Sequence, residues 1–138
     1  MSERNKVVMR RIIEEAWNQG NYEVIKETLS PDYVGHMIPA TFPAGPEGFR
    51  QYIQMYRDAI PDLHIQIDDM LYGEGKVVSR VSVRGTHGGP MMNIPPTHKK
   101  IAITGMVITR FENGRNVEMW GEHDTFGLMQ QIGVIPAE

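Results

Sequence analysis

The sequence predicts an α+β fold, in which a curved antiparallel or mixed β-sheet and three N-terminal helices enclose a cone-shaped hollow. Helical patterns occupy most of residues 3–59, and strand patterns occupy most of residues 63–125. Such segregation is typical of α+β domains rather than of alternating βαβ units. Because strands twist, a long meander of strands cannot stay flat. Helices packed on the inner face of the curled sheet therefore leave a pocket, which is a usual place for a small-molecule site.

Three helices and one short extended segment are expected in the first half of the chain. The first helix is expected over residues 3–19, where apolar residues recur at three- and four-residue steps. Its apolar stripe consists of Val8, Met9, Ile12, Ile13, Ala16 and Trp17. A shorter helix is expected over residues 22–29, followed by an extended segment at 32–37. The third helix is expected over residues 46–59, because a proline suits its first position and another proline follows its end.

Strands and one closing helix are expected in the second half. The strands are expected at about residues 63–72, 76–87, 99–111 and 116–125. Asn113-Gly114, between the last two, is the strongest hairpin signal in the chain. Residues 88–98 are rich in Gly, Pro and Met and too long for a tight hairpin, so this segment is expected to cover the mouth of the pocket. A short helix over residues 126–132 ends at Gly133.

Size, charge and composition narrow the class of protein. The 138 residues fit one domain over residues 1–138. The net charge of −3 and the lack of a basic stripe argue against nucleic acid as a partner. The chain has no cysteine, which excludes disulfides, thiolate nucleophiles and cysteine-based zinc sites. The N-terminus does not read as a signal peptide, and no run of about 18 apolar residues exists. A cytoplasmic location without a membrane partner is therefore expected.

The last strand carries the densest group of ionisable side chains. Because side chains alternate along a strand, Glu118, Trp120, Glu122 and Asp124 share one face. If that face is concave, the carboxylates are partly desolvated and repel one another, which raises their pKa values toward the range useful for proton transfer. Two alternatives stay open. Glu118 and Glu122 are solvated edge residues, or Asp124 serves as the N-cap of the closing helix.

Further candidates for substrate contact come from the two earlier extended segments. His87 ends the second strand of the meander and shares a face with Gly85, which leaves room for a ligand. The alternative is a turn histidine in contact with water. Tyr33 and His36 have opposite strand parity, so both reach the pocket only if the backbone bends near Gly35.

Arg80 and Met92 complete the set of candidates. Arg80 lies in the middle of an apolar strand and needs a partner if buried; pairing with Glu118 or Glu122 competes with substrate contact. Met92 belongs to the segment that is expected to cover the pocket and fills space there. No HxH or HExxH spacing, GxGxxG, Walker A or GxSxG motif is present, so neither a metal nor a cofactor is expected.

Several segments resemble the SnoaL-like polyketide cyclase and ester cyclase family, whose fold is the nuclear transport factor two-like (cystatin-like) cone. They are, in chain order, WNQGN at 17–21, DYVGH at 32–36, GPEG at 45–48, AIPD at 59–62, RGTHGG at 84–89, PPT at 95–97, EMWGEHD at 118–124 and QIG at 131–133. Their order and spacing carry the resemblance over nearly the whole chain.

The resemblance implies a cofactor-free, aldol-type ring closure on a small hydrophobic carbonyl compound. The family's acid/base aspartate, in its final Trp-to-Asp motif, falls on Asp124. The histidine that contacts substrate oxygens falls on His87, and the polar residue of the early short strand falls on His36. Gly85 stands at a position that is often polar in the family.

Other functions share the same fold, so the fold alone cannot decide among them. One alternative is ketosteroid-type isomerisation, and another is epoxide opening with an Asp–Arg–Asp-type water clamp that Arg80, Glu122 and Asp124 would imitate. A third is a binding or dimerisation module without catalysis, in which Asp124 is only a helix cap. By resemblance, a homodimer or higher homo-oligomer is expected. Candidates for its outer sheet face are Val107, Thr109, Met119 and Gly121.

Overall fold

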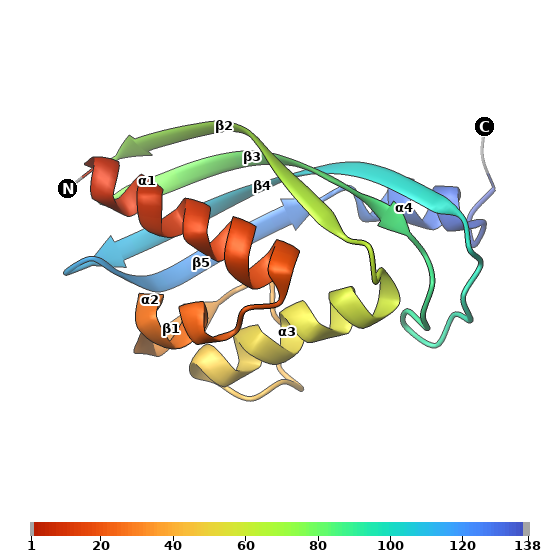
Figure 1. Cartoon of the computed structure of the whole chain (residues 1–138), viewed down its shortest axis with the longest axis horizontal. Coiled ribbons are helices and arrows are strands. Elements are labelled where there is room, and N and C mark those ends of the chain that lie inside the picture. The colour runs from red at the N-terminus through yellow and green to blue at the C-terminus, as the bar shows by residue number, and fades with distance from the viewer. Residues whose placement is uncertain (1, 137–138) are drawn as a thin grey trace.

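The computed structural model describes residues 2–136, which form an α+β arrangement of helices against one sheet (Figure 1). In chain order the elements are α1 (Ser2–Arg11), the π-helical segment η1 (Ile12–Trp17), α2 (Glu23–Thr28), β1 (Leu29–Gly35), α3 (Gly45–Ala59), β2 (His64–Gly73), β3 (Lys76–Thr86), β4 (Lys100–Glu112), β5 (Arg115–His123) and α4 (Thr125–Ile132). The predicted elements are confirmed to within a few residues. The first helix differs in that its residues 12–17 are π-helical, while residues 18 and 19 are again α-helical. Within this part of the chain, no helix is long and apolar enough to cross a membrane.

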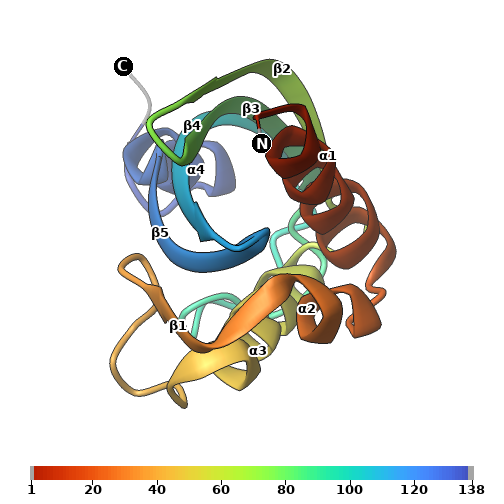
Figure 2. The same ribbon diagram turned by 90° about the vertical axis from the view of Figure 1, so that its left-hand side faces the viewer.

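The sheet has five strands in the order β1-β5-β4-β3-β2 and is open rather than closed. Strands β2 to β5 form an antiparallel meander, whereas β1 runs parallel to β5. The predicted hairpin at Asn113-Gly114 is confirmed, and both residues have positive φ values of 52° and 79°. Such a pair matches the twist of the flanking strands. Viewed end-on, the sheet is strongly curled, with α1 on one side and α2 and α3 below (Figure 2).

The inner face of the curled sheet packs on α1, η1 and α3. One apolar cluster joins Met9 and Ile12 from the N-terminal helix to Phe49 and Ile53 from α3 and to Met119 from β5. A second cluster lies where α3 ends and α4 begins. It contains Ala59, Ile60, Leu63, Met91, Ile101, Ile103, Leu128 and Ile132. Residues 88–98 therefore cover this end of the core, because Met91 is buried in the second cluster.

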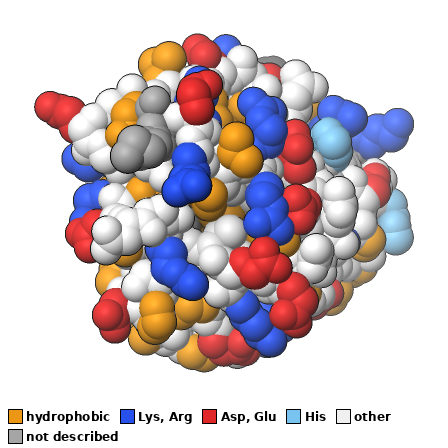
Figure 3. Space-filling view, turned by 60° about the vertical axis from the view of Figure 1, so that its left-hand side comes forward, with side chains coloured by type: hydrophobic (Ala, Val, Ile, Leu, Met, Phe, Trp, Pro, Cys, Tyr) orange, Lys and Arg blue, Asp and Glu red, His pale blue; other side chains and the backbone are white. Residues whose placement is uncertain are grey.

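The surface of α1 and η1 is polar and mixed in charge. Arg11 lies 3.2 Å from a Glu15 carboxylate oxygen and 3.1 Å from one of Glu27, so it links η1 to α2. Figure 3 shows acidic and basic side chains interspersed on one face of the molecule. Exposed pairs of this kind stabilise a fold by at most about 1 kcal/mol each. They keep the outer side of the helices in water and leave the inner side to the core.

Candidate active site

An apolar cavity of about 120 Å³ lies between the inner face of the sheet and the helices. On the helix side its wall is rich in aromatic residues and includes Trp17, Phe49, Tyr52 and Tyr56. On the sheet side it is mainly aliphatic and includes Val81, Val83, Ile101, Ile103 and Val107. The hollow predicted from the curl of the sheet is therefore present, and its lining favours apolar ligands.

Two glycines on the inner face leave room for this cavity. Gly105 lies opposite His123, and Gly121 lies opposite Val107, in the β4–β5 ladder. Both glycines line the cavity. A Cβ atom on Gly121 would lie 3.4 Å from Cγ of Met37, which is an ordinary contact distance. The space beside Gly121 thus exists because this strand position has no side chain.

His123 is the ionisable group best placed for chemistry. It is the last residue of β5, it lines the cavity, and its Nε2 atom lies 3.4 Å from Oη of Tyr56. The two rings meet edge to face, with centroids 6.0 Å apart. Burial lowers the pKa of His123 below its ordinary value, although the neighbouring charges of Glu122 and Asp124 oppose this. A neutral imidazole at neutral pH can accept a proton from a bound molecule.

Two phenols lie next to each other in this wall, and that of Tyr56 contacts the imidazole. The rings of Tyr52 and Tyr56 lie 5.2 Å apart, centroid to centroid, and both side chains come from α3. Burial raises the pKa of both hydroxyl groups, so they stay protonated over the physiological range. Tyr56 can therefore donate a hydrogen bond to an oxygen atom that gains negative charge. The cavity combines a base and a donor at one point of an otherwise apolar wall.

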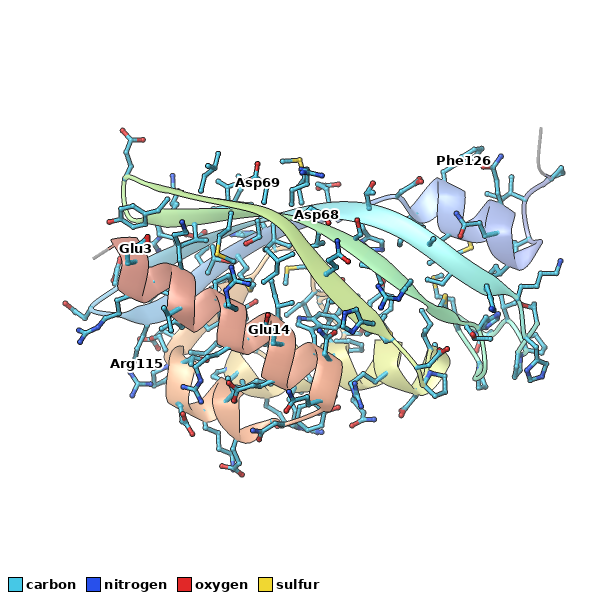
Figure 4. The ribbon with its side chains drawn as sticks, turned by 45° about the horizontal axis from the view of Figure 1, so that its top comes forward. Glu3, Glu14, Asp68, Asp69, Arg115 and Phe126 are labelled. Atoms are coloured by element: carbon cyan, nitrogen blue, oxygen red, sulfur yellow. The ribbon has the colours of Figure 1, made fainter. Side chains whose placement is uncertain are left out.

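The predicted inward orientation of Asp124 is wrong. Its side chain is exposed and caps α4, with Oδ1 accepting a hydrogen bond of 2.8 Å from the Gly127 backbone N–H. Phe126, near the start of α4, is 60% exposed and lies on the outside of the molecule (Figure 4). The physical reason is that Asp124 has the opposite strand parity to His123, which faces the cavity, and that β5 ends at His123, where Asp124 begins α4 as its cap. The cap alternative is confirmed, and catalysis by Asp124 stays a prediction without geometric support.

The predicted alternation along β5 is confirmed, but the assignment of its faces is wrong. Glu118 and Trp120 lie on the outer face of the sheet. Glu118 accepts a hydrogen bond of 2.9 Å from Nε of Arg110 and lies 2.6 Å from Nε2 of His36. The ring of His36 in turn stacks on Trp120 at 5.1 Å. These partners lower the pKa of Glu118, in contrast to the predicted rise.

Glu122 has the same strand parity as Glu118 and Trp120, but it lies at the rim of the cavity, where it is exposed. It is therefore the one residue of the predicted carboxylate face that the structure brings into contact with the cavity.

The residues predicted for an outer, dimer-forming face lie inside the molecule. Thr109 and Met119 are buried, and Val107 and Gly121 line the cavity. The exposed apolar residues of this part of the sheet are instead Met106, Ile108 and Trp120. The cause is the same as for β5, because the face of these two strands that was expected to point outward is the one that packs on the helices. A homodimer stays a prediction.

His87 is fully buried but does not line the cavity. Its Nδ1 atom lies 3.0 Å from Oγ1 of Thr97 and accepts a hydrogen bond of 3.3 Å from the Thr97 backbone N–H. Both interpretations of His87 are therefore wrong, because it neither contacts water in a turn nor lies beside the cavity. His87 instead ties the segment of residues 88–98 to the end of β3.

The other predicted contacts also lie away from the cavity. Tyr33 is buried in the core, where its hydroxyl group donates to Sδ of Met119 at 3.3 Å, while His36 is exposed. Thus Gly35 does not bring both into one pocket. Met92 is 58% exposed in the loop before β4.

Arg80 lies on the outer face and is 3.8 Å from Asp68. Asp68 is at the irregular point of β2 and is labelled in Figure 4. Its predicted pairing with Glu118 or Glu122 is wrong. The predicted epoxide-opening clamp is not formed either, because Asp124 is engaged as a helix cap. Within residues 2–136, no cluster of three His, Asp or Glu side chains is arranged to hold a metal ion.

Sequence reasoning missed the pairing of His123 with Tyr56. A signal was present in β4, where apolar residues alternate at Ile101, Ile103 and Val107. The hairpin at Asn113-Gly114 then sets the register that places this face next to His123.

Comparisons with known proteins agree with this architecture. The family model for SnoaL-like polyketide cyclases matches residues 7–132. TsrD from Streptomyces laurentii has 26% sequence identity and a TM-score of 0.88, and the match covers 96% of this chain and 97% of that one. A provisionally named polyketide cyclase from Bacillus cereus ATCC 10987 has 30% identity and a TM-score of 0.82, with 96% and 82% covered. IdmH from Streptomyces antibioticus, also provisionally named a polyketide cyclase, has 28% identity and a TM-score of 0.81, with 94% and 98% covered. No curated protein matches the sequence.

Proposed function

This chain belongs to the SnoaL-like polyketide cyclase family, and we propose that it is a cofactor-independent acid/base enzyme that closes a ring by intramolecular aldol attack. The observation that carries the proposal is the position of His123, an imidazole with a lowered pKa in the wall of an apolar cavity, 3.4 Å from the Tyr56 hydroxyl group. Neither feature alone indicates chemistry. Together they provide a proton acceptor and a hydrogen-bond donor for one small carbonyl compound.

The first step is proton abstraction from a carbon next to a carbonyl group. Nε2 of His123 takes the proton, and the electron pair of the C–H bond becomes part of an enolate. Tyr56 donates a hydrogen bond to the enolate oxygen. Because its phenol is buried and protonated, it is set to stabilise charge that develops only during the reaction.

The second step closes the ring. The enolate carbon attacks a second carbonyl carbon of the same molecule, a C–C bond forms, and the π pair of that carbonyl moves to its oxygen. The imidazolium of His123 then returns its proton to this alkoxide. The base is regenerated, and the product is an isomer of the substrate.

The apolar wall supports both steps. A molecule held against Trp17, Val83 and Val107 is shielded from water, so the enolate is not reprotonated by solvent before it attacks. The same shielding strengthens the hydrogen bond from Tyr56, because electrostatic interactions increase as the local dielectric constant falls. If the cavity holds the substrate in a bent conformation, the two carbonyl groups of the substrate come close together.

Heptane-2,6-dione provides a direct test, because its aldol closure gives 3-hydroxy-3-methylcyclohexanone, which NMR distinguishes from the substrate. We expect His123→Gln to lower the rate of closure by about 100-fold or more, the usual contribution of a general base. His36→Gln is the matched control, since His36 lies on the outer face against Glu118. It is expected to retain activity within about twofold. Equal rates for the wild type and His123→Gln would refute the proposed role.

A further inference from the structure

We infer that the cavity selects an uncharged molecule of about one ring in size, and that Gly121 sets this limit. The inference rests on the proposed function, because it concerns the substrate of the same cavity. Three properties of the described residues support it: the volume of the cavity, the charge of its lining and the empty position beside His123.

The volume restricts the size of the ligand. The cavity measures about 120 Å³, and an engineered apolar cavity of about 150 Å³ binds a single benzene ring. A rigid system of three fused rings therefore exceeds the enclosed space, and part of it would stay outside the apolar wall. The aromatic side of the wall is interlocked, since the Trp17 ring lies 6.3 Å from that of Phe49, 6.0 Å from Tyr52 and 6.1 Å from Tyr56. Moving one of these rings requires moving the others.

The lining restricts the charge of the ligand. Among the residues that the structure describes around the cavity there is no lysine or arginine, and the acidic residue, Glu122, is exposed at the rim. An anionic ligand would lose its hydration without gaining a cationic partner. A cationic ligand would lose its hydration as well, because Glu122 is exposed to water and supplies no buried anionic partner. An uncharged compound whose oxygen atom accepts a hydrogen bond from Tyr56 avoids both costs.

Gly121 determines how much room remains beside the base. It lies two residues before His123 on the same face of β5, at a spacing of about 7 Å along a strand. A Cβ atom at this position would meet Cγ of Met37 at 3.4 Å, so alanine fits, whereas the branched side chain of valine would press on Met37, which also lines the cavity, and so narrow it. The glycine does not have a positive φ value, so the backbone accepts a side chain here. The position is therefore free to vary in size without a change of fold.

The experiment measures binding by isothermal titration calorimetry, separately from turnover. The probes are cyclohexanone with one ring, 1-tetralone with two fused rings, anthrone with three, and cyclohexanecarboxylate as the anionic counterpart of the first. We expect cyclohexanone to bind most tightly, cyclohexanecarboxylate to bind at least about tenfold more weakly, and anthrone to show no binding. Gly121→Val is expected to weaken the binding of cyclohexanone at least about tenfold. Gly121→Ala is expected to weaken this binding less strongly.

Gly73→Val is the matched control, because a Cβ atom at Gly73, at the exposed end of β2, meets nothing within 4 Å. It should bind cyclohexanone as the wild type does, and thermal unfolding should verify that each variant is folded. The inference is overturned if anthrone or the carboxylate binds as tightly as cyclohexanone, if no probe binds, or if Gly121→Val binds normally. Binding of cyclohexanone without any closure of heptane-2,6-dione would refute the proposed function and leave the inference intact. Turnover that depends on His123, together with tight binding of anthrone, would overturn the inference and leave the proposed function intact.

Discussion

The two faces of β5 carry similar residue types in opposite environments. On the outer face, His36 lies against the Glu118 carboxylate and stacks on Trp120, in contact with water. On the inner face, His123 lies against a phenol in an apolar wall. The outer histidine belongs to a charge-balanced network that keeps Glu118 ionised. The inner one is kept neutral by desolvation.

This contrast shows that the number of ionisable groups is a poor guide to the position of a site. The outer face has more carboxylates, yet Glu118 is already paired, because Arg110 of the neighbouring strand donates to it. A satisfied carboxylate in water has an ordinary or lowered pKa and little tendency to take up a proton near neutral pH. The inner face has fewer polar groups. Because each of them is desolvated, it retains more capacity for proton transfer.

The largest expected difference between the two faces is in stability. Met119→Ala should lower the free energy of unfolding by about 2 to 5 kcal/mol, because Met119 is 2% exposed and its removal leaves a cavity in the core. Trp120→Ala, one residue further along β5, should lower it by less than about 1.5 kcal/mol, since Trp120 is 36% exposed. Urea denaturation followed by circular dichroism measures both. A larger loss for Trp120→Ala would contradict the assignment of the faces.

An intermediate effect is expected at the end of β5, where Asp124 leaves the sheet. Asp124→Ala should destabilise the protein by about 1 kcal/mol, because it removes the acceptor for the Gly127 backbone N–H. Asp124→Asn keeps an oxygen acceptor, so it should be close to the wild type in urea denaturation. Both variants should retain closure of heptane-2,6-dione. Loss of turnover in Asp124→Asn, with stability unchanged, would restore Asp124 as the acid/base group and displace His123.

The smallest effect expected is a dependence of stability on pH. Burial lowers the pKa of His123 in the folded protein, so the unfolded chain binds the proton first as the pH falls below about 6.5. The free energy of unfolding should therefore decrease as the pH falls from about 6.5 toward the lower folded pKa, and this contribution should level off below it. His123→Gln should show a smaller decrease than the wild type, measured by urea denaturation at a series of pH values. An unchanged pH dependence would indicate that His123 is not desolvated.

Local patterns were enough to predict the elements of this fold. Apolar steps in residues 3–19 predicted the first helix, and the turn at Asn113-Gly114 predicted the hairpin of β4 and β5. Alternation along β5 was also predicted correctly. These features depend on contacts between residues close in sequence, where backbone geometry imposes a period of two residues in a strand and 3.6 in a helix. The cap formed by Asp124 belongs to the same class of local signals.

The sequence by itself therefore determined the elements, their order and the pairs of faces that each strand offers. Only the tertiary structure decided which face of β5 the helices cover, and so which histidine is desolvated. A strand presents its two faces symmetrically, and the choice between them depends on packing against η1 and α3, which lie about 60 to 110 residues earlier in the chain. It was this long-range packing that placed Tyr56 beside His123 and left Glu118 and Trp120 on the outer face.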